Sequence, residues 1–181
     1  MSESLDRLVK ISRWGEVITK VLMIIMVIGI VAGTVALVYI AVNPDFIITA
    51  VSDGALILNV PIEDIDISAV AWALILGLLV LGVLVTALLY FTGRLFGNIY
   101  DNKTPFTDDN ARILMIMAIL IVVCTIATPI LDFAVQNIID ATYYQSYGFG
   151  VFPLFVALIL YVLSLVFKHG AELQRESDHT L

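Results

Sequence analysis

The chain has 181 residues, of which 61 % are apolar and only 14 % are charged, and its formal net charge is −7. A soluble globular domain is nearer half apolar and a quarter charged. The composition therefore excludes a disordered chain, a collagen-like chain and almost any water-soluble enzyme, and it predicts an integral membrane protein.

The net charge and the cysteine count exclude further kinds of function. The acidic balance argues against direct binding of nucleic acid by this chain. The single cysteine, Cys124, excludes an intramolecular disulfide and a zinc cluster built on cysteines.

Four uncharged stretches are long enough to cross the hydrocarbon core as helices, which takes roughly 20 residues each. They lack the strict alternation of apolar and polar residues that is typical of barrel strands. We therefore expect an all-α membrane protein in which residues 1–181 form one domain, a four-transmembrane-helix antiparallel bundle. The expected spans cover about 21–42, 69–92, 113–131 and 149–167, with an outer loop 43–68, a cytoplasmic loop 93–112 and a cytoplasmic tail 168–181.

The basic residues predict the orientation. They precede the first span, lie between the second and third, or follow the fourth, at Arg7, Lys10, Arg13, Lys20, Arg94, Lys103, Arg112, Lys168 and Arg175. Because short cytoplasmic segments carry an excess of Lys and Arg, both termini and the loop 93–112 are expected in the cytoplasm. The sequence thus predicts a multi-pass protein of the inner (cytoplasmic) membrane.

The N-terminal segment is amphipathic at helical spacing. One face carries Leu5, Leu8, Val9 and Ser12, and the other carries Arg7, Lys10 and Arg13. This pattern predicts a short helix lying on an anionic membrane surface. A frayed terminus is the other interpretation.

Small residues at intervals of four mark surfaces where helices approach closely in lipid. Gly29 and Gly33 lie in the first span, and Ala73 and Gly77 lie in the second. These stripes predict packing between the first two spans of one chain. A face for a homo-oligomer is the alternative.

The outer loop combines two β-prone runs with a turn signal. Residues 46–51 and 55–60 are rich in β-branched and apolar residues, Ser52-Asp53-Gly54 separates them, and Pro61 ends the second run. This arrangement predicts a small outer β-hairpin between the first and second spans.

No motif for catalysis or for cofactor binding is present. The outer side is acidic, with Asp45, Asp53, Glu63, Asp64, Asp66, Asp132 and Asp140. Such oxygens suit Ca²⁺ or Mg²⁺, but their spacing matches no EF-hand loop, and a solvated acidic loop is the simpler interpretation. We expect no enzyme, no cofactor and no metal site.

The cytoplasmic segments carry the most specific pattern. The loop ends in TPFTDDNARIL (104–114) and the chain ends in VFKHGAELQRESDHTL (166–181). This pair resembles the bacterial and archaeal family of domain of unknown function 2975. The resemblance rests on Pro105, Phe106, Thr107, Arg112, Phe167, Gly170, Leu173, Gln174, Glu176, Asp178 and Thr180. Arg175 departs from it, since the family often carries an acidic residue there.

The resemblance implies a four-span inner-membrane protein with no assigned reaction, often encoded beside a small Xre-type helix-turn-helix regulator. It suggests that the loop and tail dock a cytoplasmic protein, as in a membrane-bound sensor or regulatory partner. The candidate docking residues are Pro105, Phe106, Thr107, Leu173, Gln174, Glu176 and Asp178. Phe106 has a second interpretation, packing within its own chain.

A small channel or transporter subunit that acts as an oligomer is the alternative function. Such a protein should show polar residues recurring on one face of its spans. The spans hold little beyond Thr34, Thr86, Thr125, Thr128 and Ser164, whose hydroxyls can be satisfied within a helix. This scarcity favours the regulatory hypothesis.

Overall fold

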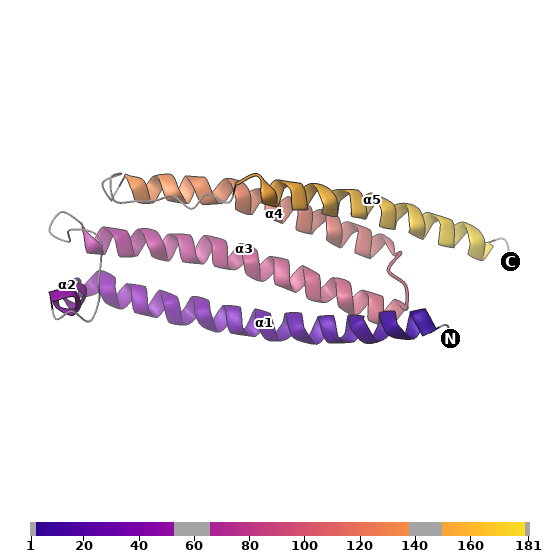
Figure 1. Cartoon of the computed structure of the whole chain (residues 1–181), viewed down its shortest axis with the longest axis horizontal. Helices are drawn as coiled ribbons and strands as arrows, with labels where there is room; N and C mark the ends of the chain where they lie inside the picture. Colours follow the sequence, from indigo (N-terminus) through magenta and orange to yellow (C-terminus); the bar gives the residue numbers. More distant parts are fainter. Residues whose placement is uncertain (1–2, 53–65, 138–149, 180–181) are drawn as a thin grey trace. The chain divides into compact units, whose positions relative to one another are not determined.

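The computed structural model describes residues 3–52, 66–137 and 150–179, and the regular structure in these ranges is helical (Figure 1). The helices are α1 (Glu3–Val42), α2 (Asp45–Ser52), α3 (Ile67–Asn102), α4 (Asp108–Gln136) and α5 (Phe152–His179). All except α2 are long and apolar enough to cross a membrane. The chain is therefore a multi-pass integral membrane protein.

The helices extend past the expected spans, mostly at the ends that carry basic residues. α1 begins at Glu3 although the first span was expected to begin near Val21, and α5 continues from Phe167 to His179. Residues 5–13 are helical as expected, but they belong to the same unbroken 40-residue helix as the span and do not form a short helix of their own. Ion pairs one turn apart, such as Lys20 with Glu16 at 2.5 Å, support the polar turns.

The chain divides into two compact units. The first unit comprises Met1–Met26, Leu84–Thr125 and Gly150–Leu181, and the second comprises Val27–Val83 and Ile126–Phe149. All nine Lys and Arg residues belong to the first unit, which we call the basic unit. The basic unit also contains most of α4 and all of α5, whereas the second unit contains parts of α1 and α3 that carry no Lys or Arg.

In the basic unit, small residues bring α1 and α3 together in an antiparallel pair. The ring of Phe96 on α3 lies against Gly15, where an added Cβ would be 2.9 Å from the ring. Thr19 covers Gly93, and its hydroxyl donates to the carbonyls of Gly15 (2.8 Å) and Glu16 (3.0 Å). The polar atom is thus satisfied within its own helix, so the contact needs no partner from water.

The second unit also pairs α1 with α3. Leu78 lies against Gly33, and Ile30 lies against Gly82, which is buried. At the end of this pair the Ser68 hydroxyl donates to the Ala41 carbonyl at 2.9 Å. At the contacts of Leu78 and Ile30, a glycine faces a branched side chain, and the two backbones can therefore approach closely without a hydrophobic driving force.

The expected outer hairpin is not confirmed. Its first strand, 46–51, lies in α2, so the prediction of a strand there is wrong, and its second strand, 55–60, lies outside the described residues. Pro44 suits the start of a helix because the first turn needs no N–H donor from it. The carbonyl of Asn43 accepts from the Phe46 N–H at 3.1 Å, and the Phe46 ring packs edge-on against Tyr39. These local partners favour a helical turn.

Candidate functional site

The loop between α3 and α4 is built from its own hydrogen bonds. Lys103 follows the last residue of α3 with a φ of 55°, the left-handed conformation that commonly ends a helix. The Phe106 N–H then donates to the Thr104 hydroxyl at 3.2 Å, and the Thr107 N–H donates to the Pro105 carbonyl at 3.1 Å. The chain therefore reverses direction within a short, internally bonded turn.

Thr107 caps α4. Its hydroxyl accepts from the Asn110 N–H at 3.1 Å, and Asp108 and Asp109 place negative charge in the first turn, where the helix dipole favours it. The Asn110 side chain is fully buried and its Nδ2 donates to the Pro105 carbonyl at 2.9 Å. Its Oδ1 has no hydrogen-bond partner among the described residues. Asn110 thus ties the loop to the helix it precedes.

The loop also packs on α5. Phe106 meets Phe167 edge-on, with ring centroids 5.5 Å apart, and its ring covers Gly170. Gln174 Nε2 donates to the Thr104 hydroxyl at 3.1 Å. Phe106 therefore packs partly within its own chain, and 36 % of the residue stays exposed.

An ion pair completes the contact between the loop region and the tail. Arg175 donates through Nη2 to Asp108 Oδ2 at 2.6 Å, across 67 residues of sequence. Arg175 stands where the resembled family often has an acidic residue, and here it has a partner within the chain. Both side chains of the pair are exposed, so it contributes at most about 1 kcal/mol to the stability of the fold. Its main effect is to hold α5 and the start of α4 in a fixed relative position.

These contacts form one surface, which we call the loop–tail surface. It contains a groove of about 470 Å³ lined by Asn102, Phe106, Thr107, Asp108, Asp109, Ala171, Gln174 and Arg175. Ala171 is buried beneath it. The loop and the tail, singled out separately in the sequence, are thus adjacent in the structure.

The candidate docking residues divide by their contacts. Pro105, Phe106, Thr107 and Gln174 take part in the internal contacts described above. Leu173 is 53 % exposed, and Glu176 is exposed as well. The side chain of Asp178 lies outside the described part of the structure.

Sequence reasoning missed Asn110, Thr104 and Arg175 as parts of this surface. For Asn110 a local signal exists, because it stands three residues after a capping threonine. For Thr104 and Arg175 the partners are about 70 residues away in the chain, and no local pattern indicates them.

The candidate packing residues lie on α1 and α3. Gly33 contacts Leu78, as described, whereas Gly29 is exposed and an added Cβ there would meet nothing within 4 Å. Gly77 has similar open space, and Ala73 is half-buried. In the α1–α3 pair Gly33 therefore lies against Leu78 and not against Gly77.

No metal centre is found in the part of the chain that the structure describes. There, no three His, Cys, Asp or Glu side chains gather closely enough to hold an ion. Of the acidic residues expected on the outer side, Asp45, Asp66 and Asp132 belong to this part, whereas Asp53, Glu63, Asp64 and Asp140 lie outside the described residues.

Comparison with known proteins identifies a family. The family model described as "Protein of unknown function (DUF2975)" matches residues 58–181, which is well over half of the chain and includes both motifs, 104–114 and 166–181. No curated protein and no solved structure matches the chain. The match covers α3, α4, α5 and the complete loop–tail surface, and the chain therefore belongs to the DUF2975 family.

Proposed function

We propose that the protein is a membrane-anchored regulatory protein whose loop–tail surface docks a soluble cytoplasmic protein. The observation that carries this proposal is that the α3–α4 loop region and the end of α5, which are far apart in sequence, contact each other. Thr104 bonds Gln174 and Asp108 bonds Arg175, across 70 and 67 residues, and both contacts lie beyond the uncharged stretches of α3, α4 and α5. A surface assembled in this way is pre-organised for binding, which lowers the entropy cost of docking.

The tail of α5, which forms one side of this surface, also carries a proposed apolar anchor, an exposed side chain that does not line the groove. Leu173 lies nearly two helical turns beyond Phe167, where the uncharged stretch of α5 ends, and its side chain stays largely exposed. Contiguous exposed apolar groups that are rimmed by polar groups mark interaction sites. Phe106 adds a partly exposed ring on the loop side.

The surroundings of this anchor suit a basic partner. Four exposed carboxylates lie on the first turn of α4 and on the tail, at Asp108, Asp109, Glu172 and Glu176. Helix-turn-helix regulators carry basic DNA-binding surfaces, and an Xre-type regulator is the partner that the family resemblance implies. The carboxylates near this surface, one of which Arg175 already pairs, would compete with DNA for such a regulator.

The orientation belongs to the same proposal. All Lys and Arg residues lie in the basic unit, so the positive-inside rule supports cytoplasmic termini, a cytoplasmic loop–tail surface and an inner-membrane location. In this arrangement the four long helices cross the membrane as an antiparallel bundle.

Two of the span hydroxyls favour docking over conduction, whereas the buried Thr34 hydroxyl has no hydrogen-bond partner among the described residues. The hydroxyl of Thr125 donates to the Ile121 carbonyl and that of Ser164 to the Tyr161 carbonyl, both at 2.8 Å. Hydroxyls satisfied within their own helices do not line a polar path. The channel hypothesis therefore gains no support from these groups.

The test compares two leucines on the same helix. Leu173→Ala removes the proposed anchor, whereas Leu165→Ala removes an equally large exposed side chain within the uncharged stretch of α5. Affinity purification from native membranes, with quantitative mass spectrometry, should recover a soluble DNA-binding protein with the wild type and with Leu165→Ala. Leu173→Ala should lower its recovery about tenfold, the effect typical of a hot-spot side chain. Equal recovery of cytoplasmic proteins by all three would contradict the proposal.

A further inference from the structure

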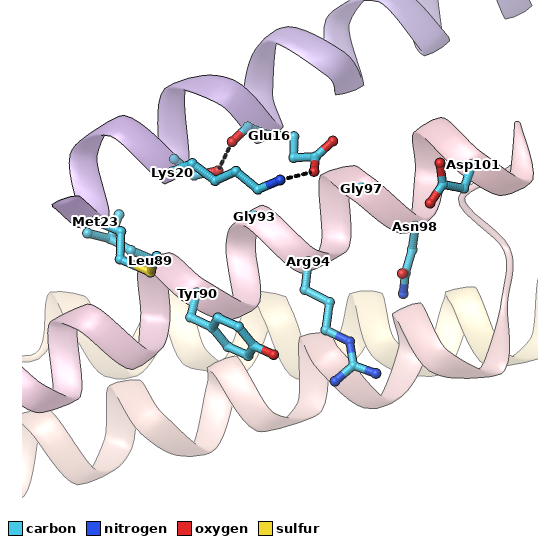
Figure 2. A pocket seen from close by; sticks show the side chains of 11 residues that line it. Glu16, Lys20, Met23, Leu89, Tyr90, Gly93, Arg94, Gly97, Asn98 and Asp101 are labelled. Atoms are coloured by element: carbon cyan, nitrogen blue, oxygen red, sulfur yellow. Dashed lines mark hydrogen bonds and ion pairs between the residues drawn. The ribbon is translucent and has the colours of Figure 1, made fainter.

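A second cavity lies between α1 and α3 within the basic unit, apart from the loop–tail surface (Figure 2). Its volume is about 370 Å³, and it is lined by Glu16, Thr19, Lys20, Met23, Leu89, Tyr90, Gly93, Arg94, Gly97, Asn98 and Asp101. Lys20 immediately precedes the uncharged stretch of α1, and Arg94 follows that of α3 by two residues. The cavity therefore lies at the level where the apolar spans give way to charged helix ends.

Two glycines of α3 let the α1 wall of this cavity approach the α3 backbone closely. Gly93 and Gly97 carry no side chains, and Thr19 and Glu16 of α1 lie opposite them. Glu16 Oε1 accepts from Lys20 Nζ at 2.5 Å, so the α1 wall holds a closed ion pair. The α1 wall is thus polar but internally satisfied.

The charges of the α3 wall differ from the ion pair of the α1 wall. Among the described residues, neither Arg94 nor Asp101 forms an ion pair or a side-chain hydrogen bond. Arg94 and Asn98 are one turn apart and project from the same side of α3 (Figure 2). A guanidinium and a carboxamide side by side offer several N–H donors to a phosphate group.

The lining changes in character along α3. At the end nearest the uncharged stretches, the lining is apolar and consists of Leu89 on α3 and Met23 on α1. Further along α3 follow the cation Arg94 and then the carboxylate of Asp101. From the hydrocarbon outward the order is therefore apolar, positive, negative. A phospholipid with an ethanolamine headgroup has the complementary order, which is acyl chain, phosphate, ammonium.

We infer that this cavity binds the headgroup of a phosphatidylethanolamine lipid, with the phosphate at Arg94 and Asn98 and the ammonium at Asp101. Charged pockets between membrane helices are known sites for lipid headgroups. The two carboxylates of the lining balance its two cations, so a purely anionic headgroup meets repulsion that a zwitterionic one does not. A choline headgroup has the same charges, but its ammonium has no N–H to donate to Asp101.

The experiment is native mass spectrometry of the purified full-length protein in detergent, titrated with lipids of identical acyl chains. The wild type should retain phosphatidylethanolamine several-fold better than phosphatidylcholine or phosphatidylglycerol. Soluble glycerophosphoethanolamine, which has the headgroup without acyl chains, should not compete at equal concentration. Arg94→Gln should lower retention of phosphatidylethanolamine about tenfold, as expected for loss of a charge-assisted hydrogen bond.

Two further variants make the assignment specific. Asp101→Asn should remove the preference for ethanolamine over choline while leaving phosphate binding in place. Lys168→Gln neutralises a basic residue that follows the uncharged stretch of α5 but does not line the cavity, and it should behave as the wild type. Arg94, Asp101 and Lys168 are all exposed, so each variant should keep the wild-type thermal unfolding by circular dichroism.

The inference is overturned by equal retention of the three lipids by the wild type, or by equal losses in Arg94→Gln and Lys168→Gln. Effective competition by glycerophosphoethanolamine would also overturn it, because the ligand would then be a soluble phosphate ester rather than a lipid.

Discussion

Phe106 lies so close to Gly170 that a Cβ added to the glycine would be 2.6 Å from the ring Cδ1. The ring is held from a second side by Phe167. The absence of a side chain at position 170 therefore lets the loop rest on α5, and this contact is the apolar part of the loop–tail surface.

The contact predicts coupled effects of two substitutions. Gly170→Ala should destabilise the protein by about 1 kcal/mol, because crowding of the ring costs about 1–3 kcal/mol and the gain in helix propensity returns about 1 kcal/mol. In a Phe106→Ala background the ring is absent, so the same Gly170→Ala change should stabilise by up to about 1 kcal/mol. The free energy of unfolding in mixed micelles, measured for all four proteins, gives the coupling. Additive effects would show that the ring does not rest on Gly170.

A matched pair of glycines on α3 tests the packing of the second unit. An added Cβ at Gly82 would be 2.7 Å from Ile30 Cδ1, whereas one at Gly77 would meet nothing within 4 Å. Gly82→Ala should therefore destabilise by about 1 kcal/mol, since crowding costs about 1–3 kcal/mol and helix propensity returns about 1 kcal/mol, and Gly77→Ala should not destabilise. Ile30→Val removes the crowded methyl group and should restore part of the loss in Gly82→Ala. If Gly77→Ala is the more damaging change in the same unfolding assay, the register of α1 on α3 is wrong.

The helical spans were predictable because lipid leaves the backbone few choices. A segment without water must satisfy its own N–H and C=O groups, so a long uncharged stretch is a helix whatever it packs against. This reasoning does not extend to residues 46–51. Their β-branched side chains suggest a strand, but β propensity reflects packing on a neighbouring strand, whereas Asn43 and Pro44 supply local helical partners.

The site was predictable only in part, for a similar reason. The capping role of Thr107 follows from residues next to it in sequence. The pairs Thr104 with Gln174 and Asp108 with Arg175 depend on how α5 packs on the loop, which no local pattern encodes. Glycine spacing indicated that the first two long helices pack together, but side-chain fit decided that Gly33 meets Leu78.

The cap of α4 gives a prediction for the loop. Thr107→Ala removes the acceptor of the Asn110 N–H and should cost about 1 kcal/mol of stability. Thr107→Ser keeps the hydroxyl and should stay near the wild type. Hydrogen exchange of the amides at 108–110 should accelerate in the alanine variant alone, since these are the first N–H groups of the helix. Equal exchange in both variants would mean that the cap does not hold the first turn of α4.

The orientation predicts the reactivity of single cysteines placed at two exposed positions. Both variants are made in a Cys124→Ala background. Asp45→Cys lies on α2, which precedes the uncharged stretch of α3 in the sequence, and Asn102→Cys lies at the end of α3, after that stretch. Because all Lys and Arg residues lie in the unit that contains Asn102, that position is expected in the cytoplasm.

An impermeant maleimide applied to intact cells should therefore label Asp45→Cys but not Asn102→Cys. Both should react once the cells are permeabilised, which controls for the intrinsic accessibility of the two thiols. Labelling of Asn102→Cys from outside would reverse the topology. It would also remove the loop–tail surface from the cytoplasm, so that no regulator of transcription could reach it.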